Sequence, residues 1–308
     1  MIYIINHNKY KAFFKSGMCK YLPDFIIPKY RARIIDDIIK GERVIGRVLG
    51  INLKPIDLSV DSCLDEYVNN ILNLKSEEDT LLYIEGLESI DRSILKEIES
   101  RTSMKIPTGE NSWLYNIPIL LKQLLKHLSE NSFGDEVLII CGDKEKTFQL
   151  IKTLPEDLRF ISMIGKDEEV LEEIYEKILD DTGISLFQPS NIKNTIKDYN
   201  VIINLSDEVI GDFKNIRRKA IIFDLSNTKS LSRLVEDYKH NIIINSININ
   251  IEDTDILKNN WLGQQVSPIV YELLMADESK EFHKIQWKNK DYSIKELINS
   301  EIKIKGNI

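Results

Sequence analysis

The chain has 308 residues, and its hydrophobic content of 43% is enough to bury the cores of two domains of ordinary size. Aspartate and glutamate outnumber lysine and arginine by 49 to 41, which gives a formal net charge of -8 at pH 7. Because this charge repels phosphate backbones, the composition argues against nucleic acid as a partner.

The cysteines and histidines do not follow the spacing of a metal or disulfide site. Cys19, Cys63 and Cys141 are far apart and form no CxxC pair, and the four histidines show neither HxxxH nor Glu-x-x-His spacing. The apolar run Met1–Ile5 is too short for a signal peptide, and no stretch of about 18 apolar residues suggests a membrane span. We therefore expect a metal-free cytoplasmic protein without a membrane span.

The first 130 residues alternate between strand and helix patterns. The helical periodicity of Leu64–Leu74 and the capping residue Asp91 predict two helices. Short apolar runs that predict buried strands occupy Met1–Ile5, Ile45–Leu53 and Thr80–Ile84. This pattern predicts an N-terminal α/β domain over residues 1–130.

A long amphipathic helix is expected at the end of this domain. Apolar residues recur every three or four positions from Asn111 to Leu128. Pro118 lacks an N–H group and is tolerated only near a helix start, so the regular helix should begin around Asn116. The polar stretch Ser129–Asp135 reads as a link to the next domain.

After Gly134 the alternation becomes regular. Helices are expected at Lys146–Leu154, Glu168–Leu179 and Ile192–Ile196. Strands are expected at Glu136–Ile140, Leu158–Ile164, Ile184–Phe187, Val201–Leu205, Ala220–Leu225 and Ile242–Ile247. Continuous Ile/Val/Leu runs predict a parallel sheet covered on both faces. The predicted fold class is thus α/β, with the N-terminal α/β domain followed by a doubly wound, Rossmann-type domain over residues 134–250.

Residues 251–308 are expected to form a helical tail that packs back on the body, with one helix around Val266–Met275. The last part, Lys280–Ile308, has seven lysines and four acids. This excess is explained either by a solvated surface or by a surface that binds a protein partner.

The loop after the first strand of the second domain keeps only part of a dinucleotide-binding pattern. That pattern, G-x-G-x-x-G, uses its glycines for a tight turn, for close approach to the pyrophosphate and for helix packing. Here Gly142 holds the first position, whereas Lys144 and Thr147 hold the second and third. The glycine loop is therefore degenerate, although Lys144, Lys146 and Thr147 either cradle a phosphate or are simply solvated.

A second signal follows at the expected distance. Gly165, Lys166 and Asp167 come after the next strand, and Gly165 lies 23 residues beyond Gly142. In the pattern, the residue that reads the ribose comes about 20 residues after the glycines. Lys166 would pair with the 2′-phosphate of NADP, whereas Asp167 would accept from the ribose of NAD, or would only cap the following helix.

Two further places are candidate ligand contacts. Ser206 follows a sheet strand, at the edge where ligands bind in open α/β sheets. Thr108, Glu110 and Asn111 precede the long helix and would line a substrate cleft. Loop formation and helix capping explain both places equally well. Cys141 ends a buried strand, and we expect it to be a core residue and not a nucleophile.

The order of these segments resembles a known family. It runs from Met1–His7 (MIYIINH) through Gly46–Pro55 (GRVLGINLKP) to Pro107–Asn111 (PTGEN), which heads the long helix before the Rossmann-type run. Over about residues 1–250 this resembles the long-chain acyl-carrier-protein reductases and related predicted amino-acid dehydrogenases. The resemblance implies a Rossmann domain like that of shikimate dehydrogenases and glutamyl-tRNA reductases, NADPH as cofactor, and a cysteine that forms an acyl thioester.

The chain departs from the family pattern at its chemical positions. The family's glycine-rich loop falls on Gly142–Thr147, where only Gly142 remains, and Glu110 separates Gly109 from Asn111. The thioester cysteine would fall near Ser267–Glu272, but no cysteine follows Cys141. The resemblance therefore implies the fold and a nucleotide-sized cleft, and not acyl transfer through a thioester.

Two functional hypotheses follow. The first is an oxidoreductase that uses NADP or NAD and transfers hydride to a small or acyl substrate without a cysteine thioester. The second is a catalytically inactive Rossmann-derived binding or scaffold protein that acts as a homo-oligomer or with a protein partner. The missing glycines favour the second hypothesis, and the spacing between Gly142 and Gly165 favours the first.

Overall fold

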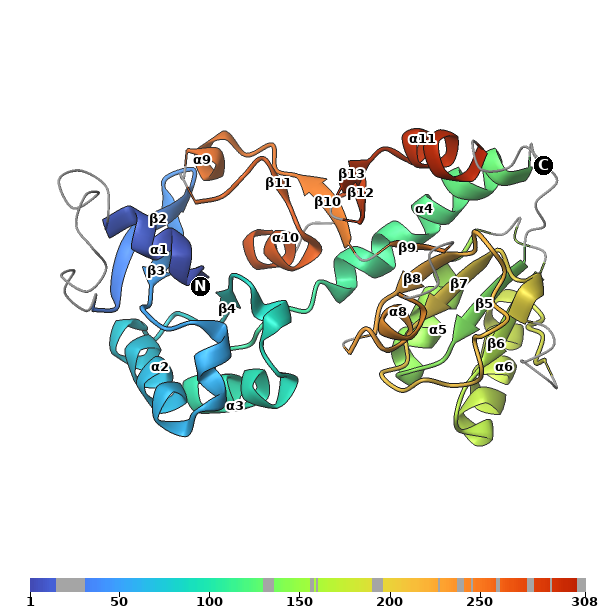
Figure 1. Ribbon diagram of the computed structural model, residues 1–308, viewed down its shortest axis with the longest axis horizontal. Coiled ribbons are helices and arrows are strands. Elements are labelled where there is room, and N and C mark those ends of the chain that lie inside the picture. Colours follow the sequence, from blue (N-terminus) through green and yellow to red (C-terminus); the bar gives the residue numbers. More distant parts are fainter. Residues whose placement is uncertain are drawn as a thin grey trace. The chain divides into compact units, whose positions relative to one another are not determined.

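The computed structural model describes residues 1–14, 31–129, 136–155, 158, 160–189, 196–226, 228–236, 241–244, 246–258, 261–275, 280–288 and 290–303. The chain divides into two compact units, each built from two separate stretches of sequence (Figure 1). The first unit comprises Met1–Gly109 and Asn250–Glu278, and the second comprises Glu110–Ile249 and Ser279–Ile308.

A four-stranded mixed sheet forms the centre of the first unit. Its strands β1 (Ile2–Ile5), β2 (Arg33–Lys40), β3 (Arg43–Gly50) and β4 (Leu82–Ile84) lie in the order β2-β3-β1-β4. Strand β1 is parallel to β3 and β4, whereas β2 is antiparallel to β3. Strand β2 is not predicted by the sequence pattern, because its adjacent acids Asp36 and Asp37 interrupt the apolar residues.

Helices cover this sheet and complete the core of the unit. They are α1 (His7–Phe14), α2 (Asp61–Leu74), α3 (Arg92–Thr102), α9 (Thr254–Leu257) and α10 (Pro268–Leu274), with short 3-10 turns at Pro55–Ser59 and Leu87–Ser89 and a two-residue strand β11 (Gln265–Val266). The apolar stripe of α2 packs with Ile4, Leu49 and Leu82 of the strands in one buried cluster. As predicted, Asp91 caps α3 and accepts a 2.8 Å hydrogen bond from the Ser93 amide.

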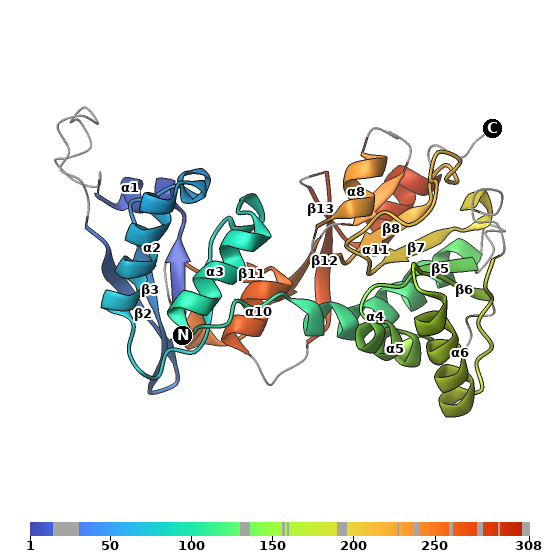
Figure 2. The same ribbon diagram turned by 90° about the horizontal axis from the view of Figure 1, so that it is seen from below.

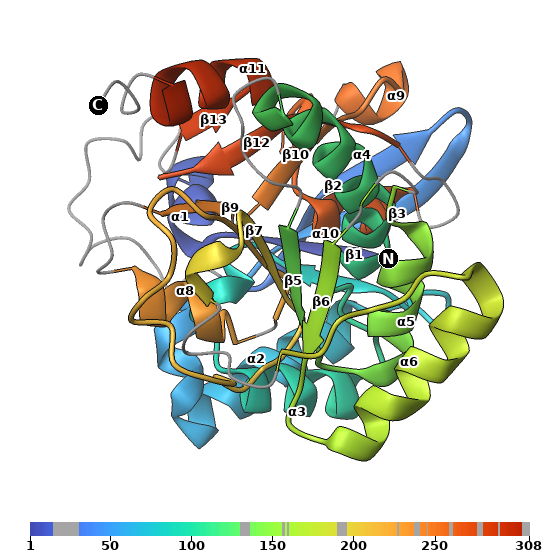
Figure 3. The same ribbon diagram turned by 90° about the vertical axis from the view of Figure 1, so that its right-hand side faces the viewer.

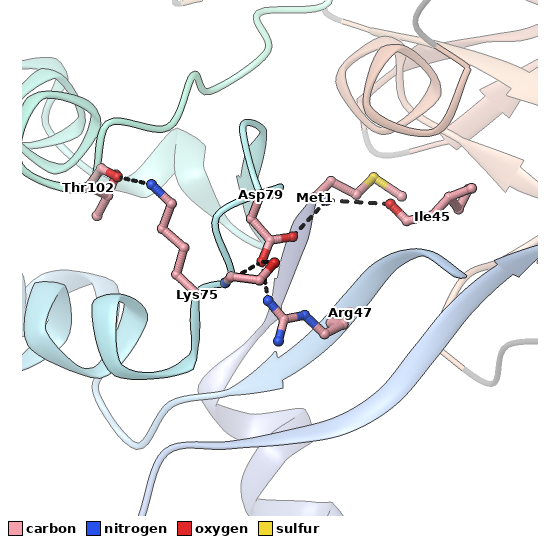
Figure 4. Close-up of polar contacts among 7 residues, drawn as sticks. Met1, Ile45, Arg47, Lys75, Asp79 and Thr102 are labelled. Carbon is pink, nitrogen blue, oxygen red and sulfur yellow. Dashed lines mark hydrogen bonds and ion pairs between the residues drawn. The ribbon is translucent and has the colours of Figure 1, made fainter. Parts of the chain in front are cut away.

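Buried Asp79 ties three segments of the first unit together (Figure 4). Its Oδ1 accepts a 2.9 Å hydrogen bond from the α-ammonium group of Met1 at the start of β1, and its Oδ2 pairs with Arg47 of β3. The amide and hydroxyl groups of Ser76 each donate to Oδ2 at 2.9 Å. The cluster therefore holds the start of β1 against β3 and the turn before β4.

The second unit contains a five-stranded sheet whose strands all run parallel. Strands β5 (Glu136–Ile140), β6 (Phe160–Ile164), β7 (Val201–Asn204), β8 (Ile221–Asp224) and β9 (Ile242–Ile244) lie in the order β6-β5-β7-β8-β9. Phe187 adds a parallel bridge to Ser162, on the outer side of β6. Counted along the chain, the order is 3-2-1-4-5-6, the order of the doubly wound dinucleotide-binding fold. The predicted α/β fold class is confirmed.

Helices lie on both faces of this sheet. Figures 2 and 3 show α5 (Lys144–Thr153) and α6 (Glu168–Thr182) together on one side, and Figure 2 shows α8 (Ser230–Val235) on the other. The residues of β5, β7 and β8 are buried on both faces, apart from the half-buried first residue of β5. Because helices cover both faces of the sheet, the strand sequences are continuous apolar runs.

The remaining elements of the second unit come from both of its sequence stretches. They are α4 (Glu110–Ser129), a 3-10 turn at Ile196–Asp198, the strands β10 (Ser246–Asn250), β12 (Phe282–Trp287) and β13 (Lys290–Tyr292), helix α11 (Ile294–Leu297) and a π-helical turn at Ile298–Lys303. Strand β12 is antiparallel to β10 and β13. Buried Asn116 of α4 donates to the Lys280 carbonyl at 3.1 Å and accepts from the Phe282 amide at 2.7 Å. This side chain therefore fixes α4 to the start of β12.

Helix α4 differs from its predicted start. It begins at Glu110 and not around Asn116, and Pro118 lies inside it. The ring removes one backbone hydrogen bond, which costs about 3 kcal/mol in an isolated helix. Four fully buried residues of α4, Ile117, Leu120, Leu121 and Leu124, gain more than this by packing. Tertiary packing therefore outweighs the local cost of the proline.

Two other expectations differ in detail, and two segments are not covered by the structure. The run Ile184–Phe187 makes only the bridge at Phe187, because the segment is half exposed and has little surface to bury. The run Ile242–Ile247 divides between β9 and β10, which pair with different sheets. Residues 130–135 of the expected link and residues 192–195 of the expected short helix lie outside the described residues.

The grouping of the chain also differs from the expected domains over residues 1–130, 134–250 and 251–308. Helix α4 belongs to the second unit, and the C-terminal segment is shared between both units and contains strands as well as helices. The buried stripe of α4 and the bonds of Asn116 explain its place in the second unit. None of the described helices is long and apolar enough to cross a membrane.

We predict that Asp79→Asn destabilises the protein by about 3 kcal/mol at pH 7, because it leaves Met1 and Arg47 without their buried partner. Burial by itself would raise the pKa of Asp79, but the hydrogen bonds from Ser76, Met1 and Arg47 outweigh it and hold the pKa well below its usual range. Its stabilising contribution should therefore be complete above about pH 4 and be lost as the pH falls below that value.

Urea unfolding between pH 7 and pH 2 measures both effects. The matched control is Asp65→Asn, which removes an exposed partner of Arg101 and should cost less than about 1 kcal/mol. Equal losses in the two variants, or an Asp79→Asn protein with the same acid sensitivity as the parent, would contradict the assigned role.

Candidate functional site

The centre of the candidate site is the point where the sheet of the second unit reverses its strand order. Strand β5 lies between β6 and β7, so the loops that follow β5 and β7 leave the sheet side by side. Ligands of open α/β sheets bind in the crevice outside the carboxyl ends of the strands at such a point. The structure places Gly142 and Ser206, both predicted from the sequence, two residues beyond the ends of these strands.

Gly142 allows these two loops to touch. A Cβ atom on this residue would lie 2.0 Å from the Leu205 carbonyl oxygen and 3.1 Å from the Ser206 amide nitrogen. Backbone atoms cannot move aside as a flexible side chain can, so only glycine fits here. The first glycine of the dinucleotide pattern thus keeps its role in the tight turn.

The N-terminus of α5 is capped by the protein's own carboxylate. Asp143 is the N-cap residue, and its Oδ1 accepts a 3.0 Å hydrogen bond from the Lys146 amide. In dinucleotide-binding folds the free N–H groups at this helix end bind the pyrophosphate. Asp143 therefore occupies, with its negative charge, part of the position that a phosphate would take.

Thr147 fills the third glycine position without disturbing the packing of α5. It is fully buried, and its hydroxyl donates a 2.8 Å hydrogen bond to the Asp143 carbonyl, as threonines inside helices do. The same hydroxyl lies 3.5 Å from the sulfur of Cys141. Burial raises the pKa of the Cys141 thiol, so this cysteine is kept neutral and unreactive at pH 7.

The lysines expected to meet a phosphate are paired with acids of the same unit. Lys144 pairs with Glu173 of α6, and the Lys146 ammonium lies 2.7 Å from a carboxylate oxygen of Glu110. Each of these side chains is at least 29% exposed, so both pairs lie in solvent and contribute little stability. Glu110, which was predicted to line a substrate cleft, is thus the partner of Lys146.

The segment after β6 combines a cap with an exposed lysine. Asp167 caps α6 and accepts from the amides of Glu169 and Val170 at 3.1 and 3.4 Å. Lys166 is 72% exposed and donates to both oxygens of Glu208, at 2.8 and 3.1 Å. Hydrogen bonding to Glu208 raises the pKa of Lys166, so its ammonium stays charged. Lys166 is therefore available to a ligand anion, whereas the Asp167 carboxylate already has a structural role.

Gly165 connects this segment to the loop of Gly142. A Cβ atom on Gly165 would lie 2.9 Å from the Leu171 side chain and 3.2 Å from Cβ of Cys141. The small residue lets the ends of β5 and β6 stay close above the start of α6. The structure thus brings Gly142, Gly165, Lys166 and Ser206 to one edge of the sheet, as the sequence predicts.

A buried polar network holds the loops after β7 and β8. Asp224 is fully buried, and its carboxylate accepts from the Asn204 side chain at 3.0 Å, the Ser226 hydroxyl at 2.6 Å and the Ser232 amide at 2.7 Å. Asn204 also donates to the Ser206 carbonyl at 3.1 Å. Because these polar groups satisfy one another's hydrogen bonds, they hold the loops after β7 and β8 rigidly at the carboxyl edge of the sheet.

Lys229 also belongs to this network, although no sequence pattern predicts it. Its backbone is left-handed, with φ of 51°, and its ammonium donates a 2.5 Å hydrogen bond to the Asp224 carbonyl. Burial lowers the pKa of Lys229, and the charges of Asp224 and Asp207 oppose that shift. Only its place five residues after the end of β8 could have indicated the residue in advance.

The predicted substrate residues are divided between the two units. Thr108 is exposed and lies next to the last residue of the first stretch of the first unit, Gly109, whose amide donates to Glu272 at 3.1 Å. Glu110 and the exposed Asn111 begin α4 in the second unit. Their grouping as a substrate cleft stays a prediction. Among the described residues, no group of three or more His, Cys, Asp or Glu side chains could hold a metal ion.

Comparisons with known proteins give only distant structural likenesses. No protein-family model matches the chain, and no curated protein matches its sequence. L-tryptophan dehydrogenase from Nostoc punctiforme aligns at 13% identity over 76% of this chain and 64% of its own, with a TM-score of 0.35. Less than two thirds of that enzyme is thus covered.

Two further structures are similar to the same degree. Quinate dehydrogenase from Corynebacterium glutamicum, solved with NAD, aligns at 9% identity over 76% of this chain and 84% of its own, with a TM-score of 0.30. Shikimate dehydrogenase from Aquifex aeolicus aligns at 10% identity over 89% and 97%, with a TM-score of 0.32. Because these TM-scores lie below 0.5, we assign the fold from the strand order itself.

We predict that Gly142→Ala destabilises the protein by about 3 kcal/mol or more, because the new methyl group would overlap the Leu205 carbonyl. The control is Gly263→Ala, where the nearest atom to the added Cβ would lie at an ordinary 3.5 Å. Neither glycine has a positive φ, so the two variants differ in available space alone. Thermal and urea unfolding compare them, and a similar small loss in both would refute the close contact.

Proposed function

We propose that this protein binds an NAD(P)-type dinucleotide at the carboxyl edge of the sheet in its second unit and transfers hydride between this cofactor and a small substrate. The observation that carries the proposal is the strand order 3-2-1-4-5-6 with Gly142 at its reversal point, in contact with the loop after β7. No thioester step is part of the proposal, because Cys141, the cysteine in the sequence of the second unit, is buried.

The pyrophosphate would lie over the turn at Gly142 and the start of α5. Lys144 and Lys146 would exchange their contacts with Glu173 and Glu110 for phosphate oxygens. Since such exposed ion pairs are worth about 0–1 kcal/mol each, the exchange costs little. Ser206 would contact the cofactor from the loop after β7.

The ribose end would favour NADP over NAD. Asp167 accepts two backbone hydrogen bonds through its Oδ1 as the cap of α6, which ties its carboxylate to the helix terminus. Lys166 is exposed and charged, and it would pair with a 2′-phosphate after leaving Glu208. The resemblance to acyl-carrier-protein reductases, which implies NADPH, agrees with this preference.

The other half of the edge would hold the reacting end of the cofactor. There Lys229 places a half-buried ammonium beside the network of Asp224 and Asn204. In this position it would bind the oxygen of a carbonyl substrate and supply a proton as hydride is added. The substrate itself would be a small molecule with a reducible carbonyl group.

A second candidate function is that of a catalytically inactive binding or scaffold protein. The observation that favours it is the carboxylate of Asp143 on the N-terminus of α5, where a pyrophosphate would otherwise bind. In such a protein the acidic side chains at the carboxyl edge of the sheet would take the place of the cofactor's phosphates. Its ligand would then be another copy of the chain or a protein partner.

We predict that NADPH raises the melting temperature of the pure protein more than NADH does. At 100 times its dissociation constant, a ligand that binds only the folded state stabilises it by about 2.7 kcal/mol. Lys166→Ala should weaken NADPH binding about tenfold, the effect of one lost charged hydrogen bond, and leave NADH binding unchanged. Calorimetric titration and thermal melting provide the measurement.

The matched control is Lys152→Ala, which removes an exposed lysine paired with Asp181 at 3.2 Å in the same unit. It should bind both cofactors as the parent does. Absence of any shift at millimolar NADPH and NADH would reject the oxidoreductase function and support the second candidate.

We also predict that Asp143→Ser tightens NADPH binding about fivefold or more. Serine keeps a capping oxygen for α5 but removes the negative charge beside the proposed pyrophosphate. The control is Asp253→Ser, since Asp253 caps α9 in the same manner, with bonds of 3.0 and 3.1 Å to the following amides. If NADPH bound equally well to both variants and the parent, the pyrophosphate would not lie at α5.

A further inference from the structure

An ion pair joins two loops at the carboxyl edge of the sheet in the second unit. The Lys166 ammonium donates to both carboxylate oxygens of Glu208, at 2.8 and 3.1 Å. Lys166 follows β6, which ends at Ile164, and Glu208 follows β7, which ends at Asn204. Because β5 lies between β6 and β7, the pair connects the two loops on either side of the turn at Gly142.

Only long side chains can make this connection. Neighbouring strands of a sheet lie about 4.8 Å apart, so the ends of β6 and β7 are separated by roughly 10 Å. A lysine and a glutamate side chain together are long enough to bridge this distance. The contact therefore depends on where the two loops place these side chains.

Hydrogen bonds fix the backbone around Glu208. Its amide donates to the Ser206 hydroxyl at 3.1 Å, and the Ser206 amide donates to Oδ1 of Asn204 at 3.1 Å. Between them, Asp207 accepts from the Thr228 amide at its carboxylate, at 3.2 Å, and from the Thr228 hydroxyl at its backbone carbonyl, at 2.8 Å. This bonded loop sets the position from which the Glu208 side chain reaches Lys166.

The proposed cofactor site uses the same lysine. In the dinucleotide pattern the residue that reads the ribose comes about 20 residues after the glycines, which is where Lys166 stands. A 2′-phosphate carries a charge of roughly −1.5 to −2 at pH 7 and takes charged hydrogen bonds from an ammonium group. The 2′-phosphate of NADPH must therefore displace Glu208 from Lys166, whereas NADH has no such group and can bind while the pair stays intact.

We propose that Glu208 sets the cofactor preference of this protein by competing with the 2′-phosphate of NADPH for Lys166. The inference rests on the proposed function and adds a specificity-determining residue to it. The Lys166 side chain is 72% exposed and that of Glu208 is 65% exposed, so the pair has the modest strength of a surface ion pair. Glu208 therefore reduces the preference for NADPH without reversing it.

The acids next to these two residues have other partners. Asp167 caps α6 through hydrogen bonds to two backbone amides, and Asp207 is bonded to Thr228. Removing either charge would disturb a helix terminus or a contact between loops. Glu208 is the acid whose charge can be removed to change the environment of Lys166 while these bonds stay in place.

The test is calorimetric titration of the full chain and of Glu208→Gln with NADPH and, separately, with NADH. Glutamine keeps the size of the side chain and removes its charge. NADPH affinity should rise about threefold to fivefold, the upper range for an exposed ion pair, and NADH affinity should stay unchanged. A variant with a damaged fold would bind both cofactors more weakly, so the ratio of the two affinities separates specificity from structure, and thermal melting verifies folding.

Two further variants complete the test. Asp181→Asn removes the same charge from α6, where Asp181 pairs with Lys152 at 3.2 Å, and should leave the ratio of affinities unchanged. The double variant Lys166→Ala/Glu208→Gln should bind NADPH within about twofold of Lys166→Ala alone, because no ammonium remains for the glutamate to hold.

Three results would overturn the role of Glu208: an unchanged ratio of NADPH to NADH affinity in Glu208→Gln, an equal rise in Asp181→Asn, or the same rise in the Lys166→Ala background. Binding of both cofactors with any of these results leaves the proposed function in place and rejects this inference alone. Binding of neither cofactor to the parent or to any variant rejects the proposed function and the inference together.

Discussion

The contact between Gly142 and the Leu205 carbonyl is the constraint on which the architecture of the second unit depends. It lets the chain turn sharply at the end of β5, so that Asp143 can cap α5 immediately afterwards. The same turn sets the position of Lys144 and Lys146 above the sheet edge. A side chain at residue 142 would separate the loops after β5 and β7 and would remove the crevice between them.

The lysines at this edge of the sheet already form ion pairs with acidic side chains of the protein itself. Lys144, Lys146 and Lys166 each contact a glutamate, and Asp143 covers the helix terminus. The strengths of the two kinds of contact decide whether a phosphate can displace these acids. Exposed pairs contribute about 0–1 kcal/mol, whereas a charged hydrogen bond to phosphate in a partly closed site contributes about 1.5–3 kcal/mol. A phosphate ligand therefore competes well for the lysines, and Asp143 is the stronger obstacle.

The sequence was informative where burial alone determines the pattern. The parallel strands of the second unit were predictable, because strands covered on both faces consist of continuous apolar runs. Gly142 and Gly165 were also predictable, since each needs a residue without a side chain after a buried strand. The start of α4 was not, because the packing of Ile117 and Leu120 outweighs the local effect of Pro118.

Other features depend on contacts between residues that are distant in sequence. Strand β2 exists because β3 supplies its hydrogen bonds, and its own residues show no clear alternation. The lysine contacts at the site depend on acids from α4, α6 and the loop after β7, which no local pattern connects. Lys229 was missed for a similar reason, since its environment is created by Asp224 and Asp207. Such contact partners can be identified only from the tertiary structure.

The division of each unit into two sequence stretches affects how the chain reaches its fold during synthesis. The sheet of the first unit leaves the ribosome early, but α9 and α10, which belong to the same unit, follow only after the whole span Glu110–Ile249. At about 5–20 residues per second, this delay is on the order of ten seconds. The early strands must therefore stay unaggregated while the second unit is made, and the charged edge strand β2, with Asp36 and Asp37, is suited to that interval.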